Sequence, residues 1–251
     1  MSETASAAVA YPTAASVPRT GVGLEPDVTG FYDEATGSVQ YVVADPITQR
    51  CAIIDPVLDF DPTSGAVRPT SADRLLRHIE AQGLTLEWIL DTHPHADHLS
   101  AARYLKEMTG APTAIGERVT EVQKIWKKLY HLPETFPTDG SQWDHLFADG
   151  ERFAVGALEA RALLCPGHTL CPMTYVMGDP AFVHDTVFMP DSGTARPIFP
   201  EATRGSSGGA FNGFCNCRST RACLSAMTTV QTAEKRAGKA PLLSRRRTIP
   251  I

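Results

Sequence analysis

Four side chains that can bind a metal lie within six positions of the sequence. They are His93, His95, Asp97 and His98, in the stretch L-D-T-H-P-H-A-D-H-L of residues 90–99. An apolar run precedes this stretch and a helix-like segment follows it, so a strand is predicted to deliver the loop to a sheet edge. Imidazoles and a carboxylate aimed at one point suit a hard or borderline cation. A lone histidine is usually structural, but this density predicts a metal site.

A further candidate ligand lies in a predicted tight turn. His168 belongs to the segment C-P-G-H-T at residues 165–169, between two predicted strands. Proline and glycine favour a turn that presents the histidine. The histidines at positions 78, 131 and 145, in a predicted helix and a predicted loop, are interpreted as surface or structural residues.

The segments around these motifs read as strands and helices in alternation. The predicted strands are residues 30–32, 40–43, 51–54, 84–90, 112–115, 152–155, 158–164, 173–177 and 181–189, and the predicted helices are residues 70–82, 99–108 and 119–130. The first three strands read as an antiparallel meander, and Thr70 or Ser71 is expected to cap the first helix. Residues 131–150 read as a loop that walls a pocket. This order predicts an α/β (α+β) fold with two sheets sandwiched between helices and the site at the sheet edge.

Composition and charge narrow the classes of function. Of the 251 residues, 43% are hydrophobic and 20% charged, and the formal net charge of −5 argues against a general polyanion binder such as a nucleic-acid-binding protein. Residues 1–22 read as a flexible leader, and no apolar run is long enough to span a membrane. The six scattered cysteines suit a reducing compartment, so a cytoplasmic protein is expected. A homo-oligomer is left open.

The motifs together resemble a known family. H-x-H-x-D-H after a strand, then P-G-H-T, then an aspartate after an apolar strand, resembles the metallo-β-lactamase superfamily, whose fold is an αββα sandwich. The stretches IIDPVL (53–58), DTHPHADHLSAARYL (91–105) and FVHDTVFMPDSGTAR (182–196) look like the persulfide dioxygenases of the glyoxalase II-like branch. The resemblance runs from about residue 30 to residue 200, within a domain taken as 23–200.

The resemblance implies a ligand set and a reaction. One Fe(II) would be held by His93, His168 and Asp185, leaving open positions for O2 and a substrate sulfur. The substrate would be glutathione persulfide, oxidised to sulfite with return of glutathione. The residues His95, Asp97 and His98 would line the pocket, while Arg196 and Asp55 would support the site.

A second reaction stays open beside the first. In the related dinuclear hydrolases, His95, Asp97 and His98 would help complete one or two Zn(II) sites bridged by Asp185, and a metal-activated water would hydrolyse a thioester. A third interpretation is a metal-binding remnant without turnover. Two departures from the family pattern lie near the site: His184 replaces a glycine before Asp185, and residues 197–198 replace a segment that carries an aspartate.

Residues 201–251 do not continue the pattern. They show no helix or strand period, contain two acidic residues, Glu201 and Glu234, and end in a basic run, whereas the resemblance implies a helix, a strand and a C-H-D-Y motif there. Read one nucleotide back from the Pro200 codon, residues 201–243 are compatible with an amphipathic helix, an LFVC strand and C-H-D-Y. The hypothesis is that this tail is the product of a frameshift and is disordered, which would weaken stability and activity. The cysteines of the tail are therefore not interpreted as a zinc site.

Overall fold

The computed structural model describes residues 15–17, 25–183, 185 and 223–224. A seven-stranded sheet has the order β1-β2-β3-β4-β7-β9-β10. Its strands are β1 (Ala15–Val17), β2 (Asp27–Tyr32), β3 (Val39–Ala44), β4 (Arg50–Ile54), β7 (Thr85–Leu90), β9 (Thr113–Gly116) and β10 (His145–Phe147). The predicted antiparallel meander is confirmed, because β2 pairs with β3 and β3 with β4 in that sense.

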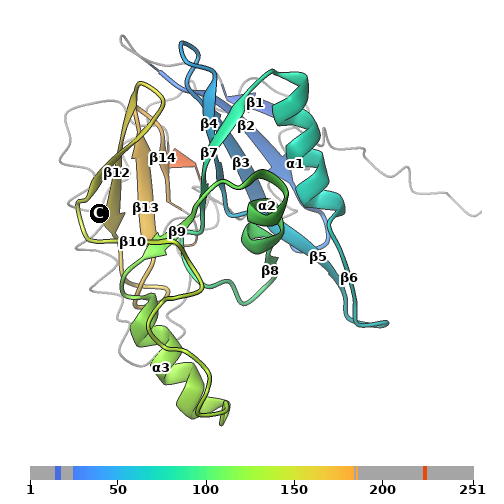
Figure 1. The fold of residues 1–251 in the computed structure, drawn as a ribbon, viewed down its shortest axis with the longest axis vertical. Coiled ribbons are helices and arrows are strands. Elements are labelled where there is room, and N and C mark those ends of the chain that lie inside the picture. The colour runs from blue at the N-terminus through green and yellow to red at the C-terminus, as the bar shows by residue number, and fades with distance from the viewer. Residues whose placement is uncertain (1–14, 18–24, 184, 186–222, 225–251) are drawn as a thin grey trace, which may run out of the picture.

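A second sheet and a small third sheet complete the strand framework. The second sheet has the order β11-β12-β13-β14-β15, and the third has the order β6-β5-β8. Their strands are β11 (Arg152–Val155), β12 (Leu158–Leu164), β13 (Met173–Met177), β14 (Ala181–Phe182), β15 (Cys223–Leu224), β5 (Val57–Asp61), β6 (Ala66–Arg68) and β8 (Leu99–Ser100). In Figure 1 the two larger sheets lie beside each other as separate layers.

Buried side chains along the strands point alternately to the two faces of the first sheet, and each face contributes to its own hydrophobic core. Tyr41 and Val43 of β3 point to the core between the sheets, where they meet Tyr175 of β13. Val42 of β3 and Ile53 of β4 point the other way, into a core closed by helices. A period of two on both faces is what a strand buried on both sides requires.

Two helices cover the outer face of the first sheet. α1 (Thr70–Ala81) buries Leu75 and Ile79 there, and α2 (Ala102–Thr109) buries Leu105. α3 (Val119–Leu129) packs through Val122 against the turn that follows β12. The chain therefore has the α/β sandwich fold predicted from the sequence, and the further helix that the family resemblance implies after residue 200 falls outside the described residues.

Several local expectations are wrong. Neither Thr70 nor Ser71 caps α1 by its side chain; instead Asp59 of β5 accepts hydrogen bonds from the Ser71 N–H and hydroxyl, both at 2.8 Å. Residues 99–100 form β8 and not the first turn of α2, because they pair with β5. The predicted loop 131–150 contains β10, which lies parallel to β9.

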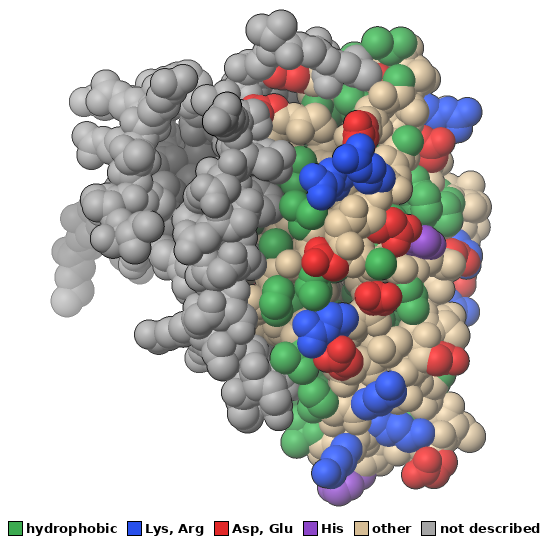
Figure 2. Space-filling view, turned by 90° about the vertical axis from the view of Figure 1, so that its left-hand side faces the viewer, with side chains coloured by type: hydrophobic (Ala, Val, Ile, Leu, Met, Phe, Trp, Pro, Cys, Tyr) green, Lys and Arg blue, Asp and Glu red, His purple; other side chains and the backbone are tan. Residues whose placement is uncertain are grey.

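Charged side chains of both signs are interspersed on the face shown in Figure 2, over the part of the chain that is described. Among those residues no helix is long and apolar enough to cross a membrane. The predicted leader 1–22, apart from the short β1, and the predicted frameshifted tail 201–251, apart from β15, lie outside the described residues. The boundaries of the domain at 23 and 200 stay a prediction.

Candidate metal centre

The carboxyl ends of three parallel strands meet at one edge of the first sheet. β4, β7 and β9 run parallel, Asp55 follows β4 directly, and the loop 91–98 follows β7 directly. Ligands in sheets of this kind bind outside the carboxyl ends of the strands. The sheet therefore positions the predicted metal loop where a site is expected.

Hydrogen bonds from both sheets hold the start of this loop. The Asp91 N–H donates to the Ala114 carbonyl at 3.0 Å, within the first sheet. From the second sheet, the Met173 N–H donates to the Thr92 carbonyl at 2.9 Å, and the Tyr175 hydroxyl donates to the Asp91 carbonyl at 2.9 Å. The backbone next to His93 is thus fixed from two sides before any metal binds.

Three predicted ligands from distant segments come together here. His93 lies in the loop after β7, His168 in the turn after β12, and Asp185 three residues beyond β14. One donor atom from each lies within 4.8 Å of the others. Asp185 Oδ2 is 3.4 Å from His168 Nε2 and 4.0 Å from His93 Nε2.

The hydrogen bonds of His93 determine which ring nitrogen faces this cluster. The Thr92 hydroxyl lies 3.1 and 3.0 Å from the two Asp55 oxygens and 3.2 Å from His93 Nδ1. Because a carboxylate only accepts, Thr92 donates its proton to Asp55 and its oxygen accepts from His93 Nδ1–H. This tautomer leaves the lone pair of His93 Nε2 toward Asp185, as a metal ligand needs.

Burial sets the protonation of the cluster. It lowers the pKa of His93 well below its usual value, and the nearby charges of His95 and His168 lower it further. Burial also raises the pKa of Asp185 to about 7, with Asp97 and Asp55 adding to the rise and His95 opposing it. A neutral imidazole can offer its lone pair to a cation, and a nearby cation would offset the cost of ionising the buried carboxylate. Both groups therefore favour a bound cation. The donors fit a metal.

A second cluster adjoins the first. Donor atoms of His95, Asp97 and His98 also lie within 4.8 Å of one another, and the His95 ring is 4.5 Å from the His93 ring. The His98 Nδ1 is 3.1 Å from Asp97 Oδ2, and the Ser38 hydroxyl donates to the same oxygen at 2.9 Å. The clusters together are typical of the two-metal sites built from histidine and aspartate.

The charge of His95 is set by a carboxylate beneath the loop. His95 Nε2–H donates to Asp55 Oδ1 at 3.1 Å. Burial alone would lower the pKa of His95, but the charge and hydrogen bond of Asp55, together with the charges of Asp91 and Asp97, outweigh it and raise the pKa to about 9. Asp55 thus contacts both Thr92 and His95, and its supporting role stays a prediction.

Sequence reasoning missed Asp91 as a member of this network. It is 2% exposed, and one of its oxygens lies within 4.8 Å of donor atoms of Asp55 and His95. It accepts hydrogen bonds from Trp143 Nε1 at 3.0 Å and from the Ser100 hydroxyl at 2.8 Å. Burial raises the pKa of Asp91. The signal was its position, directly before Thr92 in the metal loop.

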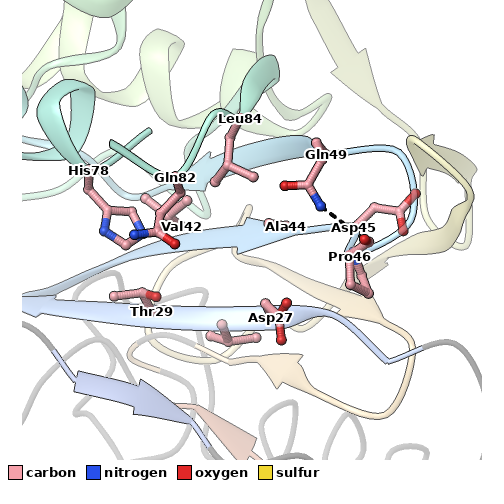
Figure 3. Close-up of a pocket in the computed structure, with 11 residues that line it drawn as sticks. Asp27, Thr29, Val42, Ala44, Asp45, Pro46, Gln49, His78, Gln82 and Leu84 are labelled. Carbon is pink, nitrogen blue, oxygen red and sulfur yellow. Dashed lines mark hydrogen bonds between the residues drawn. The ribbon is translucent and has the colours of Figure 1, made fainter. Parts of the chain in front are cut away.

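Other candidate residues lie elsewhere. His78 of α1 lines a separate pocket of about 240 Å³ between α1 and strands β2 and β3, where Gln49 Nε2 donates to the Pro46 carbonyl at 2.9 Å (Figure 3). None of the predicted ligands lines that pocket. Arg196 and His184 lie outside the described residues, so their predicted places stay predictions.

Residues 35–210 match the family model of the metallo-beta-lactamase superfamily. The chain belongs to this superfamily. A beta-lactamase hydrolase-like protein of Xylella fastidiosa strain Temecula1 is 67% identical over 175 residues, which cover 70% of this chain and 40% of that protein. Glyoxylase B2 of Dictyostelium discoideum is 49% identical over 173 residues, covering 68% and 59%. The chain thus spans less than two thirds of the length of each of these relatives.

The fold has a solved counterpart. The crystal structure of ETHE1 from Myxococcus xanthus superposes with a TM-score of 0.62 at 23% identity, covering 82% of this chain and 80% of that one. At this identity the likeness shows the shared superfamily fold. The function must be argued from the site.

Proposed function

We propose that the chain is a mononuclear iron enzyme that oxidises a persulfide with O2, glutathione persulfide being the substrate implied by the sequence motifs. The observation that carries this proposal is the cluster of His93, His168 and Asp185. Two imidazoles and one carboxylate, with one donor atom each inside 4.8 Å, form the ligand set of non-haem Fe(II) oxygenases.

The charge state of one residue of the second cluster bears on how many metals bind. His95 is held by Asp55 and its pKa is raised to about 9, so near neutral pH a second cation must displace a proton from His95 before it binds there. This feature favours one iron per chain.

The reaction is balanced by one water molecule. Glutathione persulfide, O2 and water give glutathione, sulfite and two protons. When bound, iron supplies the redox chemistry that joins O2 to the outer sulfur. The chain orients His93 through Thr92 and Asp55 and supplies the Asp185 carboxylate. Both donor residues are buried, His93 at 2% exposure and Asp185 at 7%.

A second candidate is a zinc-dependent thioester hydrolase of the glyoxalase II type. The names of the relatives, a hydrolase-like protein and a glyoxylase, support it better than they support oxygenation. So does the second donor cluster beside the first, which suits a pair of zinc ions with a bridging carboxylate. Taken alone, the comparisons favour a metallohydrolase.

Metal content and turnover separate the two reactions. Protein purified without oxygen should hold about one iron per chain, take up O2 with glutathione persulfide and release sulfite. About two zinc ions and release of glutathione from lactoylglutathione would instead establish the hydrolase. If metal-loaded protein shows neither activity, the chain is a metal-binding remnant.

A pair of variants checks that the cluster is responsible. His168→Ala removes a donor and should abolish metal binding and turnover. His145→Ala is the matched control, because His145 Nε2 lies 2.7 Å from Glu151 Oε1 and His145 does not join the cluster. Full activity in His168→Ala would reject the proposed ligand set.

A further inference from the structure

The chain turns out of the first sheet directly beneath the metal loop. β3 and β4 pair as far as Tyr41 opposite Ile54. Gln40 of β3 therefore lies next to Asp55, which follows β4 directly. The backbone φ of Asp55 is +51°, in the left-handed region, although the residue precedes Pro56, a position that favours extended backbone. A residue in such a conformation needs bonds from its surroundings to hold it.

Three hydrogen bonds hold this turn. Two of them join backbone groups: the Asp55 N–H donates to β7, and the Pro56 carbonyl accepts from the residue before α2, both at 2.8 Å. In the third, the Val57 N–H donates to Gln40 Oε1, also at 2.8 Å. Of these three bonds, only the third depends on the identity of a side chain.

This bond also determines the orientation of the Gln40 amide. Because a backbone N–H can only donate, the amide atom that faces Val57 is the oxygen. The amide nitrogen Nε2 is then buried without a hydrogen-bond partner among the described residues, in a residue that is 0% exposed. A buried N–H group without a partner is costly, so packing alone would favour an apolar residue at this position.

The turn acts on the proposed metal donors through Asp55. The Asp55 carboxylate accepts from the Thr92 N–H at 2.7 Å and from His95 Nε2 at 3.1 Å. The Thr92 hydroxyl lies 3.2 Å from His93 Nδ1 and orients that ring. A shift of the Asp55 backbone therefore moves the group that fixes the ring of a proposed ligand, and partners of this kind affect metal affinity.

We propose that Gln40 is a positioning residue of the metal centre: it fixes the turn at Asp55 through the Val57 N–H, and thereby the orientation of His93. This inference rests on the metal site of the proposed function, in either of its two reactions. The ligand that it serves is a divalent cation in the first donor cluster. Removing the Gln40 oxygen should weaken metal binding beyond any effect on the fold.

Co(II) tests this inference without turnover, because it binds the same kinds of donor as iron and zinc. Gln40→Met keeps an unbranched side chain but removes the oxygen that accepts from Val57. Titration calorimetry of the full chain, first freed of metal with a chelator, should show Co(II) binding about 10-fold weaker than in the unsubstituted chain. This is the lower end of the effects expected for partners of metal ligands. An unchanged affinity would overturn the proposal.

Gln123 of α3 provides a matched control. It is also a buried glutamine whose Oε1 accepts from a backbone N–H at positive φ, that of Gly140 at 3.1 Å, and neither residue belongs to a donor cluster of the described chain. Gln123→Met should lower the urea midpoint as Gln40→Met does, but keep the Co(II) affinity. The visible absorption of bound Co(II), which reports its ligands, should change in Gln40→Met alone. Equal loss of affinity in both variants would mean that Gln40 acts only through general stability, and would overturn the proposal.

Outcomes that involve folding are also decisive. If Gln40→Met does not fold, Gln40→Ser replaces it, because the smaller side chain leaves room for a water molecule to accept from the Val57 N–H. Folded Gln40→Ser should still bind Co(II) about 10-fold more weakly. Loss of folding in both variants would show that the bond holds the fold and not the site, and would overturn the proposal.

The proposed function fails separately from the positioning role. An unsubstituted chain that binds no Co(II) refutes the metal site itself. A chain that binds Co(II) and shows the expected difference between Gln40→Met and Gln123→Met, but neither takes up O2 nor cleaves a thioester, has the positioning residue without the proposed reactions.

Discussion

Replacing Asp55 by asparagine should destabilise the metal-free protein in a pH-dependent way. Asp55 is 3% exposed and accepts hydrogen bonds from the Thr92 N–H at 2.7 Å, from the Thr92 hydroxyl and from His95. Asparagine keeps the shape and one acceptor oxygen but removes the negative charge. The buried, positively charged His95 then lacks the negative charge that lay beside it.

The size and direction of the effect follow from the pKa of His95. Burial lowers this pKa, but Asp55, with further contributions from Asp91 and Asp97, raises it from 6.5 to about 9, which corresponds to about 3 kcal/mol of stability in total. Asp55 contributes the largest share, so the loss on its replacement should approach that figure. Because the pKa is higher in the folded state, this contribution is complete below pH 6.5 and is lost as the pH rises through 9. Above that pH, the lost hydrogen bonds of Thr92 should leave about 1 kcal/mol.

Urea unfolding with a chelator at pH 6 and pH 10 measures this difference. Asp45→Asn is the control, because Asp45 is also buried and accepts from Thr48, the Ile47 N–H and the Ala157 N–H, and no histidine contributes to the lowered pKa of its carboxyl. It lies at the opposite end of β4 from Asp55. Asp45→Asn should lose the same stability at both pH values.

The outcome that refutes this reasoning is specific. If Asp55→Asn loses as much stability at pH 10 as at pH 6, the charge of His95 does not depend on Asp55. A loss at pH 6 no larger than about 1 kcal/mol would mean that the carboxylate contributes only ordinary hydrogen bonds.

Three further perturbations follow from the structure. Trp143→Phe removes a donor from the buried Asp91 carboxylate and should cost about 1–3 kcal/mol; an unchanged urea midpoint would contradict this. Asp185→Asn should lower iron content well below one per chain with an unchanged far-UV circular dichroism spectrum, since Asp185 supplies the carboxylate donor; full iron content would count against it. Restoring the shifted frame after the Pro200 codon should raise the melting temperature and turnover, and equal values for both versions, or an intact gene reading frame on resequencing, would reject the frameshift hypothesis.

The sheets and the metal cluster could be predicted because their signals are local. β3 and β4 alternate buried side chains between two cores, and the dense motif at residues 93–98 follows a parallel strand directly. These strands end at one edge of the sheet, so motifs that directly follow them lie close together whatever conformation the loops adopt. Asp185 came from the family resemblance alone, since one aspartate after an apolar run has no distinctive spacing.

The β5–β6 hairpin and the role of Asp91 could not be predicted in the same way. The run L-D-F-D is short, and its partner strand of three residues shows little alternation. A turn signal was present: Asp61, followed by proline and later by Gly65 at φ +69°, brackets the turn, and Asp61 caps it through two hydrogen bonds. Asp91 depends on Trp143, 52 residues away, and such a contact leaves no local pattern.

The two donor clusters have similar residues but opposite electrostatic states. In the first, burial keeps His93 neutral and makes an ionised Asp185 costly, so a cation relieves the cluster. In the second, Asp55 keeps His95 protonated, and hydrogen bonds from His98 and Ser38 hold the pKa of Asp97 low against the effect of burial. The first cation should therefore prefer the first cluster. In this chain the carboxylate beneath the loop should therefore influence where the first cation binds, beside the ligands above it.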